Sequence, residues 1–383
     1  MTATTPAPTA PSGGDRRLME GSEAIATAAV AAGCRFFAGY PMTPFTEVLE
    51  HFAKLLPPVG GVCINAESEL EAVGMAWGAL ATGARAATGS TGQGLSLMQE
   101  SFSEITLAEL PLVVFNMARG QQDYFQATRG GGHGDYRHIV LAPMDITEAA
   151  ELTQLAFHLG DTWRHPVLVY GDYLTAHIQE AVAIDRLDLG ALPAKDWALD
   201  GALAGTGRSR IVSPLGFAKA GQPAPGIERH LRNIVAKQEQ IARDEVRVET
   251  AFLDDAETVI VAFGTPAKFA RYVVHQLRGD GEKVGYVRPI TLWPFPYDAV
   301  ARAAERARTM ATFELCAGQM VDDVRLGVLG RAPVVTIGGI STDGSGFGVG
   351  PLLDAEIIRD RILAIHRGGP DAELPPLPVN ERG

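Results

Sequence analysis

The chain has 383 residues, a length that favours two domains, and its 46% hydrophobic and 20% charged residues are typical of an α/β protein. Its net charge of −12 argues against a nucleic-acid partner, and no run of lysine and arginine offsets that charge. The apolar stretches are too short to span a bilayer, which needs about 20 residues. Because residues 1–20 lack an apolar core of signal-peptide length, we expect a disordered lead-in and a cytoplasmic protein.

The cysteines Cys34, Cys63 and Cys316 are widely spaced and form no CxxC pair. This spacing excludes an iron–sulfur or structural zinc site made by this chain alone. We expect buried free thiols, as in a reducing compartment.

Residues 21–183 alternate between strand and helix patterns. Strands are expected at 35–39, 62–65, 84–88, 112–117 and 166–170. Helices are expected at 22–32, 44–56, 67–82, 94–108 and 146–159. This alternation predicts a mostly parallel sheet that helices cover on both faces.

The rest of the chain divides into three parts. Residues 184–250 lose the rhythm, collect glycine, proline and charge, and are expected to form a long crossing connection. Residues 251–368 resume it, with strands expected near 258–265, 283–290, 309–315 and 333–340, which predicts a second parallel α/β layer. The proline-rich tail 369–383 is expected to be loosely ordered.

One glutamate of the helix expected at 67–82 lies on its apolar face. Counted from Glu69, the residues at +3, +4, +7 and +11 are Ala72, Val73, Ala76 and Leu80. Glu67 and Glu71 lie on another face. Because desolvating a carboxylate is costly, Glu69 on a buried stripe needs a polar partner and is a candidate functional residue.

Ligands of parallel sheets gather at the carboxyl ends of the strands, where this chain places unusual residues. The first strand is followed by YPMTP at residues 40–44. Pro44 can open the next helix, which leaves the Thr43 hydroxyl and nearby N–H groups at a helix N-terminus, where anions bind. The alternative is a simple N-cap without a ligand.

Two further loops follow later strands. Residues 89–94, GSTGQG, allow a ligand close to the backbone, but such loops are common and this one fits neither the P-loop nor the GxGxxG pattern. The next strand is followed by Arg119 and then by a loop with Arg129, His133, Asp135 and Arg137. These charged groups on a glycine-rich loop favour a function. The alternatives are a solvated loop and one that clamps a partner subunit.

Together these segments resemble the alpha subunit of the 2-oxoacid:ferredoxin oxidoreductases. YPMTP looks like the family's YPITP, AESELEAVGMAWGA like its ExE-xxxxGAxxGA helix, and GSTGQGLSLMQE like its TSGPGxSLMxE loop. VRPITLWPFP and GQMVDDVRLGV are similar to its RPxTLxPFP and GQMxxDVR segments. The resemblance extends from residue 21 to about residue 350. It implies a parallel α/β thiamine-diphosphate domain of the pyrimidine-binding type at 21–183 and a smaller transketolase-C-like α/β domain at 251–368.

Within the family, DYFQATRGGGHGDYRHIVLAP looks most like the subgroup that acts on branched-chain and other hydrophobic or aryl 2-oxoacids. The 2-oxoglutarate subgroup carries an RGGPSTG-type loop after its arginine, and residues 119–123 depart from that pattern and are shorter. The alternatives are the same reaction on 2-oxoglutarate or pyruvate, and a non-catalytic scaffold subunit. An independent nucleotide-binding protein fits less well, because the phosphate motifs are missing.

The resemblance implies a role for each candidate residue. Glu69 falls on the cofactor-activating glutamate, which hydrogen-bonds the aminopyrimidine ring of thiamine diphosphate. Thr43 and Arg119 fall on residues that bind the substrate carboxylate. Further substrate candidates are Arg129 and His133, and further cofactor candidates are Tyr40, Pro41, Ser90, Thr91 and Gly92.

The resemblance also implies partner chains. Gly279-Asp280-Gly281 looks like the start of the GDG…N signature for Mg2+ and diphosphate, but no asparagine follows at the required spacing, so a turn is the better interpretation. Mg2+ and a 4Fe–4S cluster are therefore expected on a beta subunit that carries GDG…N and shares the thiamine diphosphate. A gamma subunit, a ferredoxin-like subunit, ferredoxin and coenzyme A complete the expected partners. The implied reaction converts a 2-oxoacid to acyl-CoA and CO2.

Overall fold

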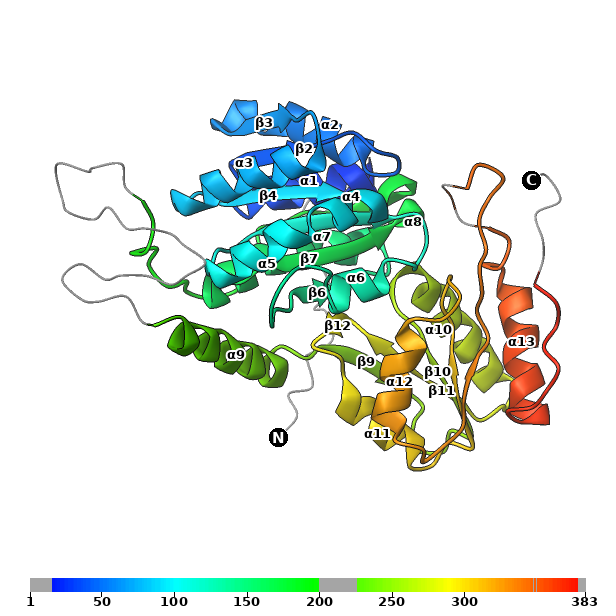
Figure 1. Cartoon of the computed structure of the whole chain (residues 1–383). Helices are drawn as coiled ribbons and strands as arrows, with labels where there is room; N and C mark the ends of the chain where they lie inside the picture. Colours follow the sequence, from blue (N-terminus) through cyan, green and yellow to red (C-terminus); the bar gives the residue numbers. More distant parts are fainter. Residues whose placement is uncertain (1–15, 200–225, 347, 349, 378–383) are drawn as a thin grey trace, which may run out of the picture.

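The computed structural model describes residues 16–199, 226–346, 348 and 350–377, which form two α/β units (Figure 1). The first unit contains a seven-stranded sheet with the order β3-β2-β4-β5-β7-β6-β12. Its strands are β2 (Phe36–Gly39), β3 (Val62–Asn65), β4 (Ala86–Ser90), β5 (Val113–Ala118), β6 (Ile139–Leu141), β7 (Val167–Asp172) and β12 (Thr291–Trp293). All neighbouring pairs are parallel except β12 and β6, as the alternating pattern predicts for the first unit.

Helices cover both faces of this sheet. They are α1 (Gly21–Ala31), α2 (Thr46–Leu55), α3 (Glu69–Ala81), α4 (Gly92–Leu97), α5 (Gln99–Leu107), α6 (Tyr124–Thr128), α7 (Ile146–Trp163) and α8 (Tyr173–His177). Successive strand residues enter opposite cores: Val113 packs with α1, α2 and α7, whereas Val114 packs with α3 and α5. The helix expected at 94–108 is divided into two helices, α4 and α5, which are separated at Met98.

The second unit has a five-stranded sheet with the order β14-β13-β10-β11-β9. Its strands are β9 (Val248–Ala251), β10 (Thr258–Val261), β11 (Val284–Pro289), β13 (Thr309–Thr312) and β14 (Val334–Thr336). Its helices are α10 (Gly264–Gly279), α11 (Tyr297–Ala304), α12 (Met320–Val328) and α13 (Ala355–Gly368). The four strands expected in this layer pair in parallel as predicted, and the additional edge strand β9 runs antiparallel to β11.

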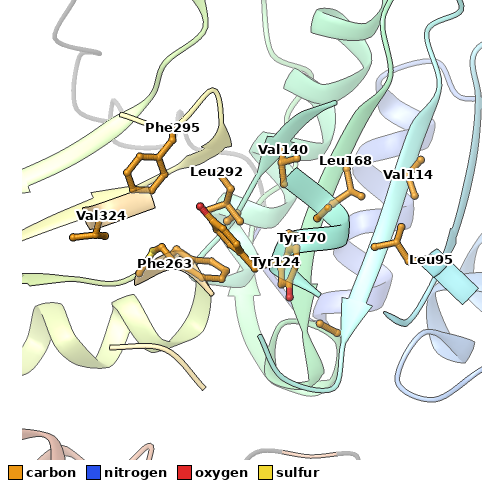
Figure 2. Close-up of a cluster of buried hydrophobic side chains, with 14 of the residues drawn as sticks. Leu95, Val114, Tyr124, Val140, Leu168, Tyr170, Phe263, Leu292, Phe295 and Val324 are labelled. Atoms are coloured by element: carbon orange, nitrogen blue, oxygen red, sulfur yellow. The ribbon is translucent and has the colours of Figure 1, made fainter. Parts of the chain in front are cut away.

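The two units share a hydrophobic core. Phe263 of the second unit contacts Tyr124 and Tyr170 of the first, and its ring centroid lies 5.6 and 5.7 Å from theirs (Figure 2). Leu292 and Phe295 extend this cluster from the second unit. The strand β12 also comes from the sequence range of the second unit but extends the first sheet. The contact between the units therefore includes an apolar part that is continuous with the core.

The structure corrects the expectation for one connecting segment and adds a helix to another. Arg17–Glu20 forms a strand, β1, antiparallel to β8 (Gln179–Val182), so this end of the 1–20 lead-in is ordered, while 1–15 lie outside the described residues. The expected crossing connection contains an 18-residue helix, α9 (Ile227–Asp244), and 200–225 lie outside the described residues. The sequence pattern obscures α9 because its buried face includes His230 and Gln238, which hydrogen-bond the carbonyls of Leu107 and Asp135.

Other expectations concern thiols, the GDG segment and membranes. All three cysteines are free thiols, but Cys63 is only half-buried. Burial raises the pKa of the Cys34 thiol to about 12.

Gly279-Asp280-Gly281 forms the turn that ends α10, as predicted. Among the described helices, none has both the length and the apolar content needed to cross a bilayer.

Candidate functional site

Four adjacent parallel strands bring the candidate residues to one edge of the first sheet. The strands β3, β2, β4 and β5 are neighbours, and their carboxyl ends lie together. Glu69 follows β3, the 40–44 loop follows β2, Thr91 follows β4 and Arg119 follows β5. This edge is where ligands of parallel sheets bind.

Glu69 is the first residue of α3 and is only 3% exposed. Ala72, Val73, Ala76 and Leu80 are buried with it, so the predicted helical face is confirmed. Ser90 Oγ at the end of β4 donates to Glu69 Oε1 at 3.0 Å, which provides the expected polar partner.

Gly94 of α4 makes room for this pair. A Cβ atom at position 94 would lie 2.0 Å from Ser90 Oγ and 2.4 Å from Glu69 Oε1, far inside van der Waals contact. The last glycine of the 89–94 loop therefore allows α4 to pack directly on the carboxylate.

The 40–44 loop differs from its prediction. Thr43 and Pro44 are joined by a cis peptide bond, and a turn in which Phe45 N donates to Met42 O precedes the helix. Because α2 begins only at Thr46, the prediction that Pro44 opens it is wrong, and Thr43 does not lie in the first turn of this helix. The loop instead contacts its neighbours: Arg119 Nε donates to Thr43 O at 3.0 Å, and Thr91 Oγ1 donates to Met42 Sδ.

A cavity of about 450 Å³ lies where the loops after β4 and β5 meet. It is lined by Gly92, Gln93, Ser96, Arg119, Gln122, Asp123, Gln126 and Gly346. Gly92 and Arg119 were predicted, and the adjacent side chains were not. Gly346 comes from the second unit, so both units contribute to the wall.

Asp123 is the acidic group of this wall, and the sequence reasoning did not single it out. Burial raises the pKa of its carboxyl, while hydrogen bonds from Asn116 and Gln126 and the charge of Arg119 oppose the rise. A Cβ on Gly92 would lie 2.1 Å from Asp123 Oδ1, so the close approach of these loops requires glycine. The position of Asp123 in the loop that follows β5 was the signal available in the sequence.

Comparisons with known proteins identify the family. Residues 27–198 match the model described as pyruvate flavodoxin/ferredoxin oxidoreductase, thiamine diphosphate-binding, and residues 256–346 match pyruvate:ferredoxin oxidoreductase core domain II. Ketoisovalerate oxidoreductase subunit VorB of Methanothermobacter marburgensis is 36% identical over 321 residues, which cover 81% of this chain and 89% of VorB. The chain belongs to the 2-oxoacid:ferredoxin oxidoreductases as an alpha-type subunit.

Other relatives support the same family and fold. The 2-oxoglutarate synthase subunit KorA of Methanothermobacter thermautotrophicus is also 36% identical, over 83% of the alpha subunit and 92% of KorA. A 2-oxoglutarate:ferredoxin oxidoreductase from Magnetococcus marinus, solved with 2-oxoglutarate, coenzyme A and succinyl-CoA bound, superposes with a TM-score of 0.76 at 25% identity, over 96% of this chain and 68% of the other. A split-gene transketolase shares the fold at 14% identity and a TM-score of 0.54, over 91% and 96%. VorB and KorA are named for different substrates and are equally identical to this chain.

Of the four predicted substrate residues of the alpha subunit, Arg119 lines the cavity, whereas Thr43, Arg129 and His133 are not among its lining residues. Arg129 Nη1 forms an ion pair with Asp323 Oδ2 at 2.9 Å, and its guanidinium stacks on the Phe125 ring. His133 is exposed in the loop between α6 and β6. The geometry gives no support to a substrate role for Arg129 or His133, and both roles stay predictions.

His138 lies at the end of the loop between α6 and β6 and is buried. Its burial leads us to expect a pH dependence of stability. Burial lowers the pKa of His138 to about 3, whereas an unfolded histidine titrates near 6.5. Below pH 6.5 the unfolded state therefore binds a proton that the folded state excludes, and stability falls by about 1.4 kcal/mol per pH unit. We expect His138→Gln to remove about 2 kcal/mol of the loss between pH 6.5 and pH 5. Denaturant titrations at the two pH values measure it, and parallel curves for both proteins would contradict the prediction.

The residues at this edge fit part of thiamine diphosphate. The buried Glu69 carboxylate is an acceptor for a ring N–H group, and Gly92 and Gly94 keep the surrounding backbone accessible. In the described part of the chain, no three His, Cys, Asp or Glu side chains are grouped to hold a metal ion. The buried Glu69 carboxylate thus has the chemistry that would suit the aminopyrimidine end of the cofactor.

Proposed function

We propose that the alpha subunit acts with partner chains in the oxidative decarboxylation of a hydrophobic, branched-chain or aryl 2-oxoacid to acyl-CoA and CO2. Electrons pass through iron–sulfur clusters of the partners to ferredoxin. The observation that carries the proposal is the buried Glu69 carboxylate, held by the Ser90 hydroxyl at the same edge of the sheet as Arg119, which lines the cavity.

Glu69 is the residue proposed to act on the cofactor. Thiamine diphosphate, when bound, stabilises the negative charge left on the substrate carbon as CO2 departs. Glu69 holds the aminopyrimidine ring through a carboxylate oxygen and exchanges a proton with its ring nitrogen. The hydrogen bond from Ser90 fixes the orientation of that carboxylate. The other proposed cofactor contacts are Tyr40, Pro41, Ser90, Thr91 and Gly92.

Arg119 and Thr43 are proposed to position the substrate. A guanidinium binds a carboxylate through two charge-assisted hydrogen bonds, and the threonine hydroxyl adds a donor. The 3.0 Å bond from Arg119 Nε to the Thr43 carbonyl couples the two loops that carry these side chains. Holding the substrate in this way lowers the entropic part of the barrier.

The substrate class is supported by the segment 123–143 and by the 36% identity to a ketoisovalerate oxidoreductase subunit. The second candidate is 2-oxoglutarate, which the equal identity to KorA and the 2-oxoglutarate-bound structural relative favour. Both candidates use the same reacting groups and differ only in the substrate side chain.

Turnover of a substrate panel by the purified complex tests the proposal. With a low-potential acceptor and coenzyme A, we expect the highest kcat/KM for 2-oxoisovalerate or an aryl pyruvate, by about tenfold or more over 2-oxoglutarate, because a well-matched apolar side chain adds about 1–3 kcal/mol. A preference for 2-oxoglutarate or pyruvate would sink the substrate assignment. The absence of turnover on every acid would sink the reaction itself.

A beta subunit is the first proposed partner, which would bring the Mg2+ and diphosphate site and its 4Fe–4S cluster. Large apolar side chains of α3 and α4 are exposed and available to a partner chain: Leu70 is 49% exposed, Met75 is 40% exposed and Leu97 is 50% exposed. A gamma subunit and a ferredoxin-like subunit are further proposed partners, and an acidic ferredoxin would dock on one of them, because this chain carries a net charge of −12.

A further inference from the structure

The short helix α6 begins without the cap that its own sequence offers. Its N-cap residue is Asp123, an amino acid well suited to cap a helix, yet the carboxylate makes no capping bond. It accepts hydrogen bonds from Asn116 and Gln126 at the cavity instead. A five-residue helix with an uncapped first turn is marginal by itself.

A glutamine of the second unit provides the missing cap. Gln319 Oε1 accepts from Phe125 N at 2.8 Å, and Gln319 Nε2 donates to Gln122 O at 2.7 Å. One planar amide thus spans the first turn of α6. Gln319 is itself fixed, because its backbone N–H and that of Met320 donate to the fully buried Glu314 carboxylate, each at 2.9 Å.

Neighbouring contacts hold the same loop against the second unit. Gln121 Oε1 accepts from Leu315 N at 2.8 Å, and Gln121 Nε2 donates to Phe263 O at 3.0 Å. The Tyr124 hydroxyl donates to Asp323 at 2.6 Å. The stretch between Arg119 and α6, which lines the cavity, is therefore shaped by the second unit.

We propose that Gln319 is a positioning residue for the substrate-binding loop of the alpha subunit. Because Gln319 caps α6, the Asp123 carboxylate is left to line the cavity. Gln319 also keeps the loop that begins at Arg119 in its position beside the cavity. Gln319 acts through this loop and does not line the cavity among the described residues. The inference rests on the proposed substrate role of Arg119.

Gln319→Met in the purified complex tests the inference, because methionine preserves the volume and removes both hydrogen bonds. We expect KM for the 2-oxoacid to rise at least about tenfold while KM for coenzyme A stays within about twofold, since a misplaced loop weakens substrate positioning. Gln319→Glu retains the acceptor for Phe125 N–H and loses the donor. Its KM for the 2-oxoacid should therefore lie between the KM of the wild type and that of Gln319→Met. Gln276→Met removes an exposed side chain–side chain hydrogen bond on α10 and should leave both KM values unchanged.

A double-mutant cycle separates positioning from general destabilisation. If Gln319 acts through Arg119, adding Gln319→Met to Arg119→Met should raise KM no further. If Gln319→Met raised KM by the same factor in the wild type and in Arg119→Met, the inference would be overturned.

Hydrogen exchange gives a readout that does not depend on turnover. Gln319→Met should accelerate amide exchange at Phe125 and in the rest of α6, whereas Gln276→Met should not. Unchanged exchange would overturn the inference whether or not the complex is active. Inactivity of the wild-type complex on every 2-oxoacid would overturn the proposed function instead.

Discussion

Replacing Glu69 with glutamine is expected to reduce 2-oxoacid turnover by about 10²–10⁴-fold, the range over which general acid–base groups contribute. Glutamine keeps the size of the side chain and can still accept the Ser90 hydrogen bond, but it cannot exchange a proton with the cofactor ring. Assembly with the partner chains should be unaffected. Acceptor reduction and CO2 release measure the activity, and size-exclusion chromatography measures the assembly.

Glu67→Gln is the matched control for this variant. Glu67 lies two residues earlier and is exposed, so its replacement should leave turnover within about twofold of the wild type, as is usual for surface positions. Wild-type turnover in Glu69→Gln would favour the alternative in which this chain is a non-catalytic scaffold. Loss of assembly in Glu69→Gln would indicate a structural role for the carboxylate.

Gly94→Ala is expected to reduce turnover by about 100-fold without changing any reacting group. The new methyl would lie 2.0 Å from Ser90 Oγ and 2.4 Å from Glu69 Oε1, so the pair must separate or α4 must move. A displacement of about 1 Å at a catalytic group costs about two orders of magnitude in rate. Overpacking should also lower the unfolding free energy by about 1–3 kcal/mol. Steady-state kinetics and thermal unfolding of the complex measure the two effects.

Gly279→Ala distinguishes this effect from a general intolerance of added methyl groups. Gly279 is the last residue of α10, and a Cβ there has no heavy atom within 4 Å. Its turnover and melting temperature should equal those of the wild type. Full activity in Gly94→Ala would show that the Ser90–Glu69 geometry does not matter for the reaction.

The elements that the sequence predicted well are those with local periodicity. The buried face of α3 follows from the 3.6-residue repeat alone, and it brought out Glu69 before any contact was known. The helix α9 was missed because polar side chains such as His230 and Gln238 occupy its buried face and bond to backbone carbonyls of the first unit. Such partners are distant in sequence and leave no periodic pattern.

The candidate site was predictable to a similar extent. Strand ends indicated the loops that carry Thr43, Ser90 and Arg119, because parallel strands deliver their carboxyl ends to one edge. The turn before α2 and the cavity carboxylate of Asp123 were not predicted, since both depend on how adjacent loops pack.

By itself the sequence determined the α/β alternation, the glutamate on an apolar helical face and the motifs of the 2-oxoacid:ferredoxin oxidoreductase family, because these are local patterns. The tertiary structure alone decided that Ser90 meets Glu69, that β12 extends the first sheet and that Gln319 caps a helix nearly 200 residues away. Hydrogen bonds between segments that are distant in sequence form only when those segments pack against each other, and no spacing along the chain specifies them.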